Sequence, residues 1–306
     1  MLRNGCLREK PCMAAFEAYR RVAVATCDAL TAGAVVKTEV KPGKRSRLGT
    51  LPIAPAAPPL YMPEPPGLTP PPALLSLPQP FVAPRGQGLW RERYTACCAA
   101  CFVHAAVCHH HVEVPLRCLL IGHNPSTHAW ASGYPFSNPS NRFYKLLREA
   151  GILAQHIRPC DADAVPALFG LGWTDAGCVP GSDASEYKRA VMLAWRDDLY
   201  SRLKAHLARI AAWTGHECDA EAIAPRVVAF AGKRQWASLF QPPLAGGFNH
   251  GVQDVRPPGW PLPASTEVWV LPSSSGRAVM TAEQRQGPYM ELGRRLADLP
   301  WPRTHH

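Results

Sequence analysis

The 306-residue sequence contains no apolar run of the roughly 18 to 20 residues that a transmembrane helix needs, so no membrane partner is expected. Charged residues are few, at 18% against 47% hydrophobic residues, and such a composition allows one well-buried core. Acidic residues are the scarcer charge: 23 Asp and Glu stand against 33 Lys and Arg, for a formal net charge of +10. This balance favours a polyanionic partner such as nucleic acid, although a basic protein without such a partner would show it too.

The eleven cysteines lack the regular spacing of a disulfide-stapled secreted protein, and their number is odd, which predicts reduced thiols inside a cell. The N-terminal segment is rich in arginine and small apolar residues, as in an organelle transit peptide, but it includes Glu9 and Glu17. The basic run at 41–47 is typical of a nuclear address or of a solvated linker. We expect a nuclear location, with a mitochondrial or other organelle location as the alternative.

Proline is dense between residues 41 and 86, where missing amides and fixed φ angles rule out a regular helix or a central strand. We predict that residues 1–86 form a basic, Pro-rich and largely disordered extension, and that 87–306 form one folded domain. The Pro-rich segment is a passive spacer in the simpler interpretation and a ligand for a partner domain in the other.

A patch rich in cysteine and histidine follows at 97–111. It holds Cys97, Cys98, Cys101, His104, Cys108 and His109 to His111. The pair spacing of a metal site is present, but structural zinc needs a second pair placed so that four donors converge. Spacings of three, three and four residues also describe one stripe of a short apolar helix. A helix packed on the domain, with no metal, is therefore expected, and a metal site is the alternative.

Three short apolar runs that end at turns predict buried parallel strands, at 116–122, 226–231 and 267–271. Helical patterns lie between them, one after Ser140 and a longer one after Ser185. The longer pattern repeats its apolar residues at intervals of four, at Val191, Trp195, Leu199, Leu203 and Leu207. Strands that alternate with helices predict an α/β fold whose ligand site lies beyond the carboxyl ends of the strands.

Two motifs stand at such strand ends. The first begins with G-H-N-P-S at 122–126 and continues with G-Y-P-F-S-N-P-S-N-R-F-Y-K at 133–145. The second reads L-P-S-S-S-G-R at 271–277. Two further segments lie between them, G-L-G-W-T-D at 170–175 and F-A-G-K at 230–233.

In this order the four segments resemble the mismatch-specific uracil/thymine DNA glycosylases, of the uracil-DNA glycosylase superfamily. That family carries G-I-N-P-G followed by G-x-x-F/Y-x-x-P-x-N-x-F-W, and the triple serine is similar to its thymine-processing branch. The likeness covers roughly residues 115–300. It implies a three-layer α/β/α fold with a central, mostly parallel four-stranded sheet in the catalytic domain at 87–306. It also implies a monomer without a cofactor or metal, acting on double-stranded DNA that contains uracil or a mismatched pyrimidine.

Cleaving deoxyribose from a pyrimidine requires that the nucleotide be flipped out, that the departing base anion be stabilised, and that a water be held against C1′. By the resemblance, Asn124 orients that water, Phe136 stacks on the base, and backbone amides near His123 and Phe136 bind the pyrimidine carbonyls. Because an amide is no strong base, slow turnover is expected, with electron-poor bases cleaved fastest. For Asn124 taken alone, a turn residue before proline is the alternative.

The serine-arginine loop is expected to contact DNA. The resemblance implies that Ser273 and Ser275 donate hydrogen bonds to phosphates, that Gly276 belongs to the same DNA-binding loop, and that Arg277 enters the gap left by the flipped nucleotide and contacts the orphaned partner base. A polar loop without that role is the alternative. Lys233, with Arg142, could grip the DNA backbone, although ordinary solvated surface is the simpler interpretation.

Three features depart from the family pattern. His123 stands where an apolar residue is usual and Ser126 where glycine is usual, and both are expected to line the base pocket. Asp175 replaces Asn or Lys; its carboxylate could accept the uracil N3 proton but would repel a departing base anion, and a surface acid or helix cap is the alternative. The long N-terminal extension, which has no counterpart in the compact bacterial enzymes, is the third.

The leading hypothesis is a monofunctional glycosylase that leaves an abasic site and an intact strand, because no lysine in the motifs is placed to form a Schiff base. One alternative is a DNA-binding module of the same fold that has lost turnover through His123 or Ser126. Another is a related α/β enzyme that acts on free nucleosides, which would not need Arg277.

Overall fold

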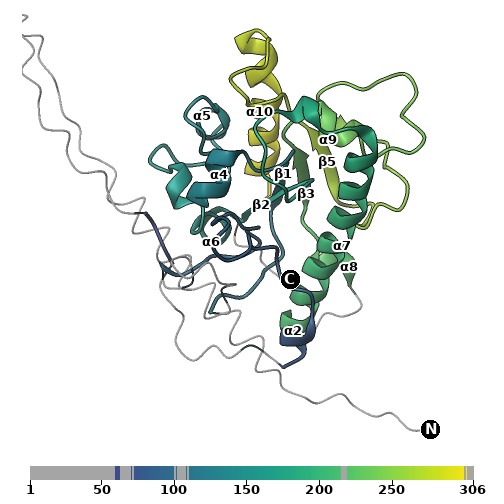
Figure 1. Ribbon diagram of the computed structural model, residues 1–306. Coiled ribbons are helices and arrows are strands. Elements are labelled where there is room, and N and C mark those ends of the chain that lie inside the picture. Colours follow the sequence, from purple (N-terminus) through teal and green to yellow (C-terminus); the bar gives the residue numbers. More distant parts are fainter. Residues whose placement is uncertain are drawn as a thin grey trace, which may run out of the picture.

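A computed structural model describes residues 59–62, 70, 72–99, 101, 108, 110–214, 219–299 and 301 (Figure 1). The candidate transit peptide and the basic run at 41–47 lie outside these residues, as do His104 and His109. Within the described part of the chain, no helix is both long and apolar enough to cross a membrane.

A five-stranded sheet lies at the centre, in the order β2-β1-β3-β5-β4. Its strands are β1 (Cys118–Gly122), β2 (Leu171–Asp175), β3 (Val227–Phe230), β4 (Gly251–Gln253) and β5 (Glu267–Val270). The first four strands in this order pair in parallel, and β4 pairs antiparallel with β5. The predicted α/β fold with a mostly parallel sheet is confirmed. The expected four strands are the parallel ones, and the fifth, β4, is a short edge strand that presents no apolar run.

Helices cover both faces of the sheet and complete the three predicted layers (Figure 1). The described helices are α2 (Pro72–Ser76), α4 (Thr127–Ser132), α5 (Phe143–Glu149), α6 (Val165–Phe169), α7 (Arg189–Thr214), α8 (Ala220–Ile223), α9 (Lys233–Ala237) and α10 (Ala282–Ala297). Because successive strand residues point to opposite faces, Leu120 packs with α5 and α10, while Leu119 packs with α7 and α9. The site is therefore built on a sheet that is buried on both sides.

The two predicted helices after Ser140 and Ser185 are α5 and α7. In α7 the predicted apolar stripe is only partly buried: Leu199 and Leu203 are inaccessible, whereas Val191 is 42% exposed. A spacing of four exceeds the helical repeat of 3.6 residues, so a stripe with that spacing turns gradually away from the core.

The described part of the Pro-rich segment packs on the domain. Helix α2 buries Leu74, and the isolated bridge between Val82 and Arg91 ties the following chain to the core. The prediction that this stretch contains no regular helix was therefore wrong at α2. Pro72 begins the helix, where a missing amide costs nothing because the first turn has no acceptor for it.

Candidate active site

The carboxyl ends of β1, β2, β3 and β5 meet at one edge of the sheet, and a cleft of about 300 Å³ lies over them. Eight of the residues predicted for the site line this cleft: His123, Asn124, Ser126, Phe136, Asp175, Lys233, Ser273 and Ser275. Gly276 and Arg277 follow directly after Ser275, at the rim. The segments that the sequence separates by about 150 residues therefore share one site.

The side-chain amide of Asn124 is held in one orientation. Its Nδ2 lies 2.9 Å from the carbonyl oxygen of Val179 and 3.1 Å from that of Gly181. Carbonyl oxygens only accept hydrogen bonds, so this end of the amide must be the NH₂ donor. The Oδ1 atom consequently faces Nδ1 of His123 at 2.7 Å and keeps a second lone pair for another donor.

The imidazole of His123 supports Asn124 more than it shapes a base pocket. Its ring lies edge-on to Trp195, with centroids 5.5 Å apart, and 5.8 Å from the ring of Tyr187. Burial, together with the charge of Arg234, lowers the pKa of His123, so the ring is neutral at pH 7. A neutral ring that donates from Nδ1 to Asn124 Oδ1 fixes its own tautomer. His123 borders the cleft, as expected, but its ring packs against aromatic neighbours.

Ser126 begins helix α4. Its Oγ accepts a hydrogen bond from the backbone N–H of Ala129 at 3.1 Å, which makes it the N-cap residue. A serine in place of the usual glycine thus has a structural reason. Ser126 lines the cleft, but its oxygen is already used by the helix.

Asp175 and Phe136 form the floor of the cleft, against Gly122 at the end of β1. A Cβ atom at Gly122 would lie only 1.9 Å from Asp175 Oδ1 and 3.0 Å from Phe136 Cζ, so the end of β1 must be glycine. Asp175 is only 6% exposed, and burial raises its pKa to about 7. The alternative of a surface acid or helix cap is wrong, because this carboxyl group is buried at the end of β2.

As part of this floor, Phe136 presents a fixed aromatic surface. Its ring stacks on Phe143, with centroids 3.8 Å apart and planes inclined by 24°. It is the one non-glycine residue of the described chain with a positive φ, at 54°. Such a backbone costs energy and persists only where the surroundings enforce it, often at functional sites. The geometry suits a ring that must stack on a planar ligand.

A buried ion pair holds the end of β2 in place. Arg202 contacts Glu92 at 2.5 Å and donates to the backbone oxygens of Asp175 and Ala176, both at 3.0 Å. Burial alone would raise the pKa of Glu92, but Arg202 and a hydrogen bond from Thr174 keep it below its ordinary value. No local sequence pattern predicts this pair, since its members are 110 positions apart.

The serine loop packs against the start of α5. The backbone N–H of Arg142 donates to the Ser274 carbonyl at 2.9 Å, and a Cβ atom at Gly276 would lie 2.7 Å from the carbonyl oxygen of Ser140. Glycine is therefore required at 276 for this close approach. The two sequence motifs are joined directly, so the loop and the α5 start form one wall.

Arg277 is exposed and lies on the cleft side of the molecule. Hydrogen bonds from Ser185, aided by the charges of Arg277 and Arg234, lower the pKa of Asp183. Asp183 follows Ser182, which lines the cleft together with Asn124. Arg277 thus lies in the cleft region with Asn124, and its side chain is exposed.

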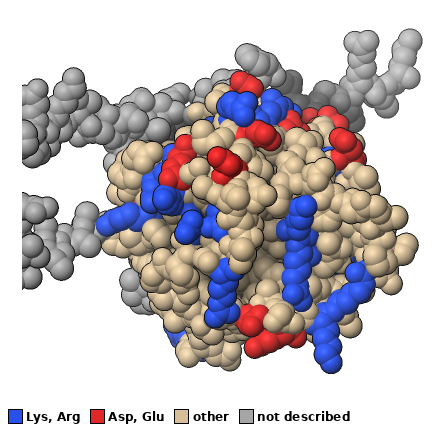
Figure 2. Space-filling view, turned by 90° about the horizontal axis from the view of Figure 1, so that it is seen from above, with Lys and Arg blue, Asp and Glu red and all other residues tan. Residues whose placement is uncertain are grey.

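Two further cations border the cleft from α9. Lys233 donates to the carbonyl of Phe248 at 2.7 Å and lies over that ring, and Arg234 donates to the carbonyl of Tyr187 at 2.7 Å. Sequence reasoning did not identify Arg234 or Tyr187, because the loop that holds Tyr187 shows no periodic pattern. Figure 2 shows the face above the strand ends with Lys and Arg side chains spread across it.

The family model described as Uracil DNA glycosylase superfamily matches residues 109–296 of the chain. This range spans well over half of the sequence and includes all the cleft-lining residues except Trp90. It also contains the whole five-stranded sheet.

Proposed function

We propose that this chain, which belongs to the uracil DNA glycosylase superfamily, hydrolyses the N-glycosidic bond of a flipped-out uracil in double-stranded DNA and leaves an abasic site. Members of this superfamily act on DNA and hydrolyse such bonds. Thymine or a damaged pyrimidine opposite guanine is proposed as a further substrate. One observation carries the proposal: the carboxamide of Asn124 is fixed at the strand ends, over the floor made by Phe136 and Asp175.

DNA binding comes first. The exposed Arg277 extends from the wall formed by the serine loop, and Ser273 and Ser275 line the cleft beside it. Serine hydroxyls donate to phosphate oxygens, and a long cationic side chain can occupy the space that a flipped nucleotide leaves. Docking of this wall on the lesion strand brings the extruded base to the cleft floor.

The base then stacks on Phe136, whose other face is already supported by Phe143. Because this platform is rigid before the ligand arrives, little ordering is required on binding. The Asp175 carboxyl group lies at the same floor and can meet the polar edge of a pyrimidine.

The attacking water is held by Asn124. Its Oδ1 uses one lone pair for His123 and can accept from the water with the other. The water oxygen bonds to C1′ as the bond from C1′ to N1 breaks, the base departs with the electron pair, and the water proton passes to solvent. Since Asn124 positions the water without taking its proton, positioning and leaving-group stability set the rate.

The departing base anion is stabilised by a hydrogen-bond donor, whereas a negatively charged carboxylate would repel it. With a pKa of about 7, Asp175 is largely protonated below neutral pH and can donate a hydrogen bond to a pyrimidine oxygen. The repulsion expected of a carboxylate is thereby avoided. A buried donor at this position strengthens as negative charge develops on the base.

Strand cleavage is not part of this proposal. Lys233 is the lysine among the cleft-lining residues, and its amine is bound to the Phe248 carbonyl. A Schiff-base nucleophile needs a free amine, and this contact holds the Lys233 amine on the backbone. A monofunctional enzyme is therefore proposed.

A DNA-binding module without turnover is the second candidate, and one contact favours it. His123 occupies one lone pair of Asn124 Oδ1, where an apolar residue would leave both lone pairs to water. If the remaining lone pair points away from the nucleotide, the fold would bind DNA and cleave nothing.

A substrate panel tests these candidates. The full chain is incubated with duplexes carrying U·G, U·A, T·G, ethenocytosine or hypoxanthine, and with free deoxyuridine. Abasic sites in the duplexes are scored after alkali, uracil released from deoxyuridine is measured by chromatography, and duplex affinity is measured by fluorescence anisotropy. Cleavage of U·G duplex, with strands intact before alkali, is the expected result. Tight duplex binding with no abasic site would support the binding module, and cleavage of deoxyuridine alone would support a nucleoside enzyme.

A further inference from the structure

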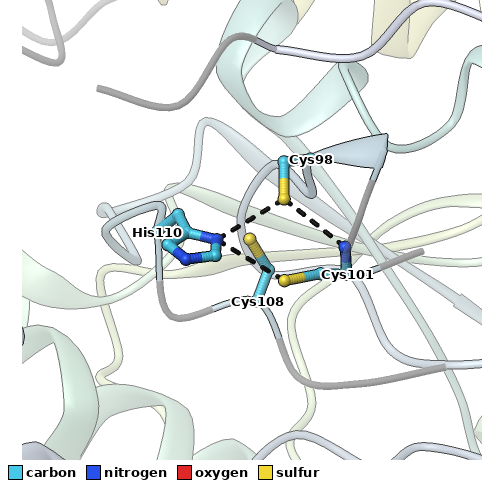
Figure 3. Close-up of side chains that lie close together, drawn as sticks. All are labelled: Cys98, Cys101, Cys108 and His110. Carbon is cyan, nitrogen blue, oxygen red and sulfur yellow. Dashed lines mark hydrogen bonds between the residues drawn. The ribbon is translucent and has the colours of Figure 1, made fainter. Parts of the chain in front are cut away.

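A second group of side chains, made of cysteine and histidine residues that could act as metal ligands, lies outside the cleft. Cys98, Cys101, Cys108 and His110 point toward one another, and one ligand atom from each lies within 4.8 Å of all the others (Figure 3). None of the four lines the cleft. Three thiols and an imidazole are a donor set that chemistry associates with soft metal ions.

Two distances in this group match a tetrahedral site. The Nδ1 atom of His110 lies 3.5 Å from Cys98 Sγ and 3.5 Å from Cys101 Sγ. With zinc bonds of about 2.3 Å to sulfur and 2.0–2.1 Å to nitrogen, a tetrahedron has an S···N edge of about 3.5 Å and an S···S edge of about 3.8 Å. The largest separation exceeds the longer edge by only about 1 Å.

We propose that Cys98, Cys101, Cys108 and His110 bind one structural zinc ion. Four protein ligands close the coordination sphere, which is typical of structural rather than catalytic zinc. An iron–sulfur cluster usually requires four thiolates, and this group supplies three. A single disulfide would use two thiols and would not account for the imidazole between them.

A neighbouring residue supports the proposed site. Nδ1 of His111 lies 3.3 Å from Cys108 Sγ, and His111 is buried. An N–H group placed against a metal-bound thiolate orients it and spreads its charge. His111 is thus a positioning residue.

The proposed zinc site lies in the part of the chain just before β1. Two hydrogen bonds surround it: Cys97 N–H donates to the Asp163 carbonyl at 3.1 Å, and Thr95 Oγ1 donates to the Val112 carbonyl at 2.6 Å. Zinc would join the segment of Cys98 and Cys101 to that of Cys108 and His110, beside the contact between Thr95 and Val112. Since residues 112–117 lead directly into β1, the ion would stabilise the strand that ends at the active site.

This proposal revises the expectation of a metal-free helical stripe. Cys101 is helical, but Cys108 and His110 are not, and the chain returns to bring them against the first pair. Cys108 and His110 form the second ligand pair, which the spacing in the sequence did not define.

Metal analysis of the full chain tests the proposal. The protein is produced without a metal-binding tag in zinc-supplemented medium, dialysed, and measured by plasma mass spectrometry. We expect about one zinc per chain in the wild type and in Cys160→Ser, a half-buried thiol outside the group, and less than about a tenth in Cys101→Ser and Cys108→Ser. Equal zinc in all four proteins, or none in the wild type, would overturn the proposal.

Because a variant without zinc could fail to fold, a second measurement uses the wild type alone. Cobalt added to the chelator-treated protein should give the intense visible bands of a tetrahedral thiolate complex, and zinc should abolish them. Weak octahedral bands, or iron with a brown chromophore in the protein as isolated, would contradict a structural zinc site.

Discussion

Asp175 is buried against Gly122 and Phe136, and its pKa lies near 7 instead of its ordinary value of 3.8. Desolvation is the main cause, and the charge of Glu92 adds to it, while Arg202 opposes both. Between pH 6 and 8 this one side chain changes from a hydrogen-bond donor to a charged acceptor.

The first prediction concerns the pH dependence of base release. If protonated Asp175 assists the leaving base, the single-turnover rate of the wild type should fall about tenfold between pH 6 and 8. Asp175→Asn keeps an N–H donor at every pH and should show a flat profile. A wild-type rate that rises with pH would mean that the carboxylate accepts the pyrimidine N3 proton instead.

The same group should affect stability in a defined direction. The pKa of Asp175 is higher in the folded state than its ordinary value of 3.8, so its contribution to stability is most favourable below about pH 4 and declines as pH rises to about 7. Relative to the wild type, Asp175→Asn should therefore gain on the order of 2–4 kcal/mol on going from pH 4 to pH 8. Urea unfolding at the two pH values measures this, and an unchanged difference would rule out a raised pKa.

Among the helices and strands, the sequence predicted best those strands that consist mainly of consecutive apolar residues. β1, β3 and β5 are apolar runs because both faces of a parallel sheet are covered, and each run ends in residues of the cleft. Asn124 and Ser273 could be placed together for that reason. β4 could not be predicted, since an edge strand of three residues carries no such run.

Contacts between distant segments escaped prediction. The pairing of Arg202 with Glu92, and the approach of Cys108 and His110 to Cys98, depend on the path of the intervening chain. The spacing of residues in the sequence predicts which side chains are neighbours on one helix or strand, but it does not predict the path of the chain between distant segments. The role of His123 was missed for a related reason: its partners, Trp195 and Tyr187, lie on α7 and the loop before it.

Helices α5 and α10 pack closely against each other, and two glycines of α10 offer a matched pair of variants that test this packing. A Cβ atom at Gly293 in α10 would lie 2.1 Å from the Ala150 carbonyl at the end of α5, whereas one at Gly287 would meet nothing within 4 Å. Gly293→Ala should destabilise the fold by about 2 kcal/mol or more, because α5 and α10 must separate. Gly287→Ala should change stability by less than about 1 kcal/mol. Thermal unfolding compares them, and equal losses would contradict this packing.

For the molecule as a whole, charge is divided unevenly. Residues 1–58 contain ten Lys and Arg against four Asp and Glu, which is more than half of the formal net charge of +10. The match to the superfamily begins only at residue 109. Residues 1–58 can therefore add electrostatic attraction to DNA to that of the matched region.

Removal of residues 1–58 should weaken duplex binding at about 50 mM salt and flatten the dependence of log Kd on log salt, because fewer counterions are released. The rate of base release at saturating protein should remain within about twofold, since all the cleft-lining residues that the structure describes are retained. Fluorescence anisotropy over a salt series gives the slope. An unchanged slope would show that residues 1–58 do not contact DNA.

The central claim is that a fixed carboxamide positions water for attack at an extruded nucleotide. Its most direct test is the single-turnover rate of Asn124→Ala on a U·G duplex, measured beside duplex affinity. We expect the rate to fall by about 10² to 10³-fold while Kd changes less than about threefold, because Asn124 acts on the water and not on the DNA backbone. A variant that cleaves as fast as the wild type would contradict the account.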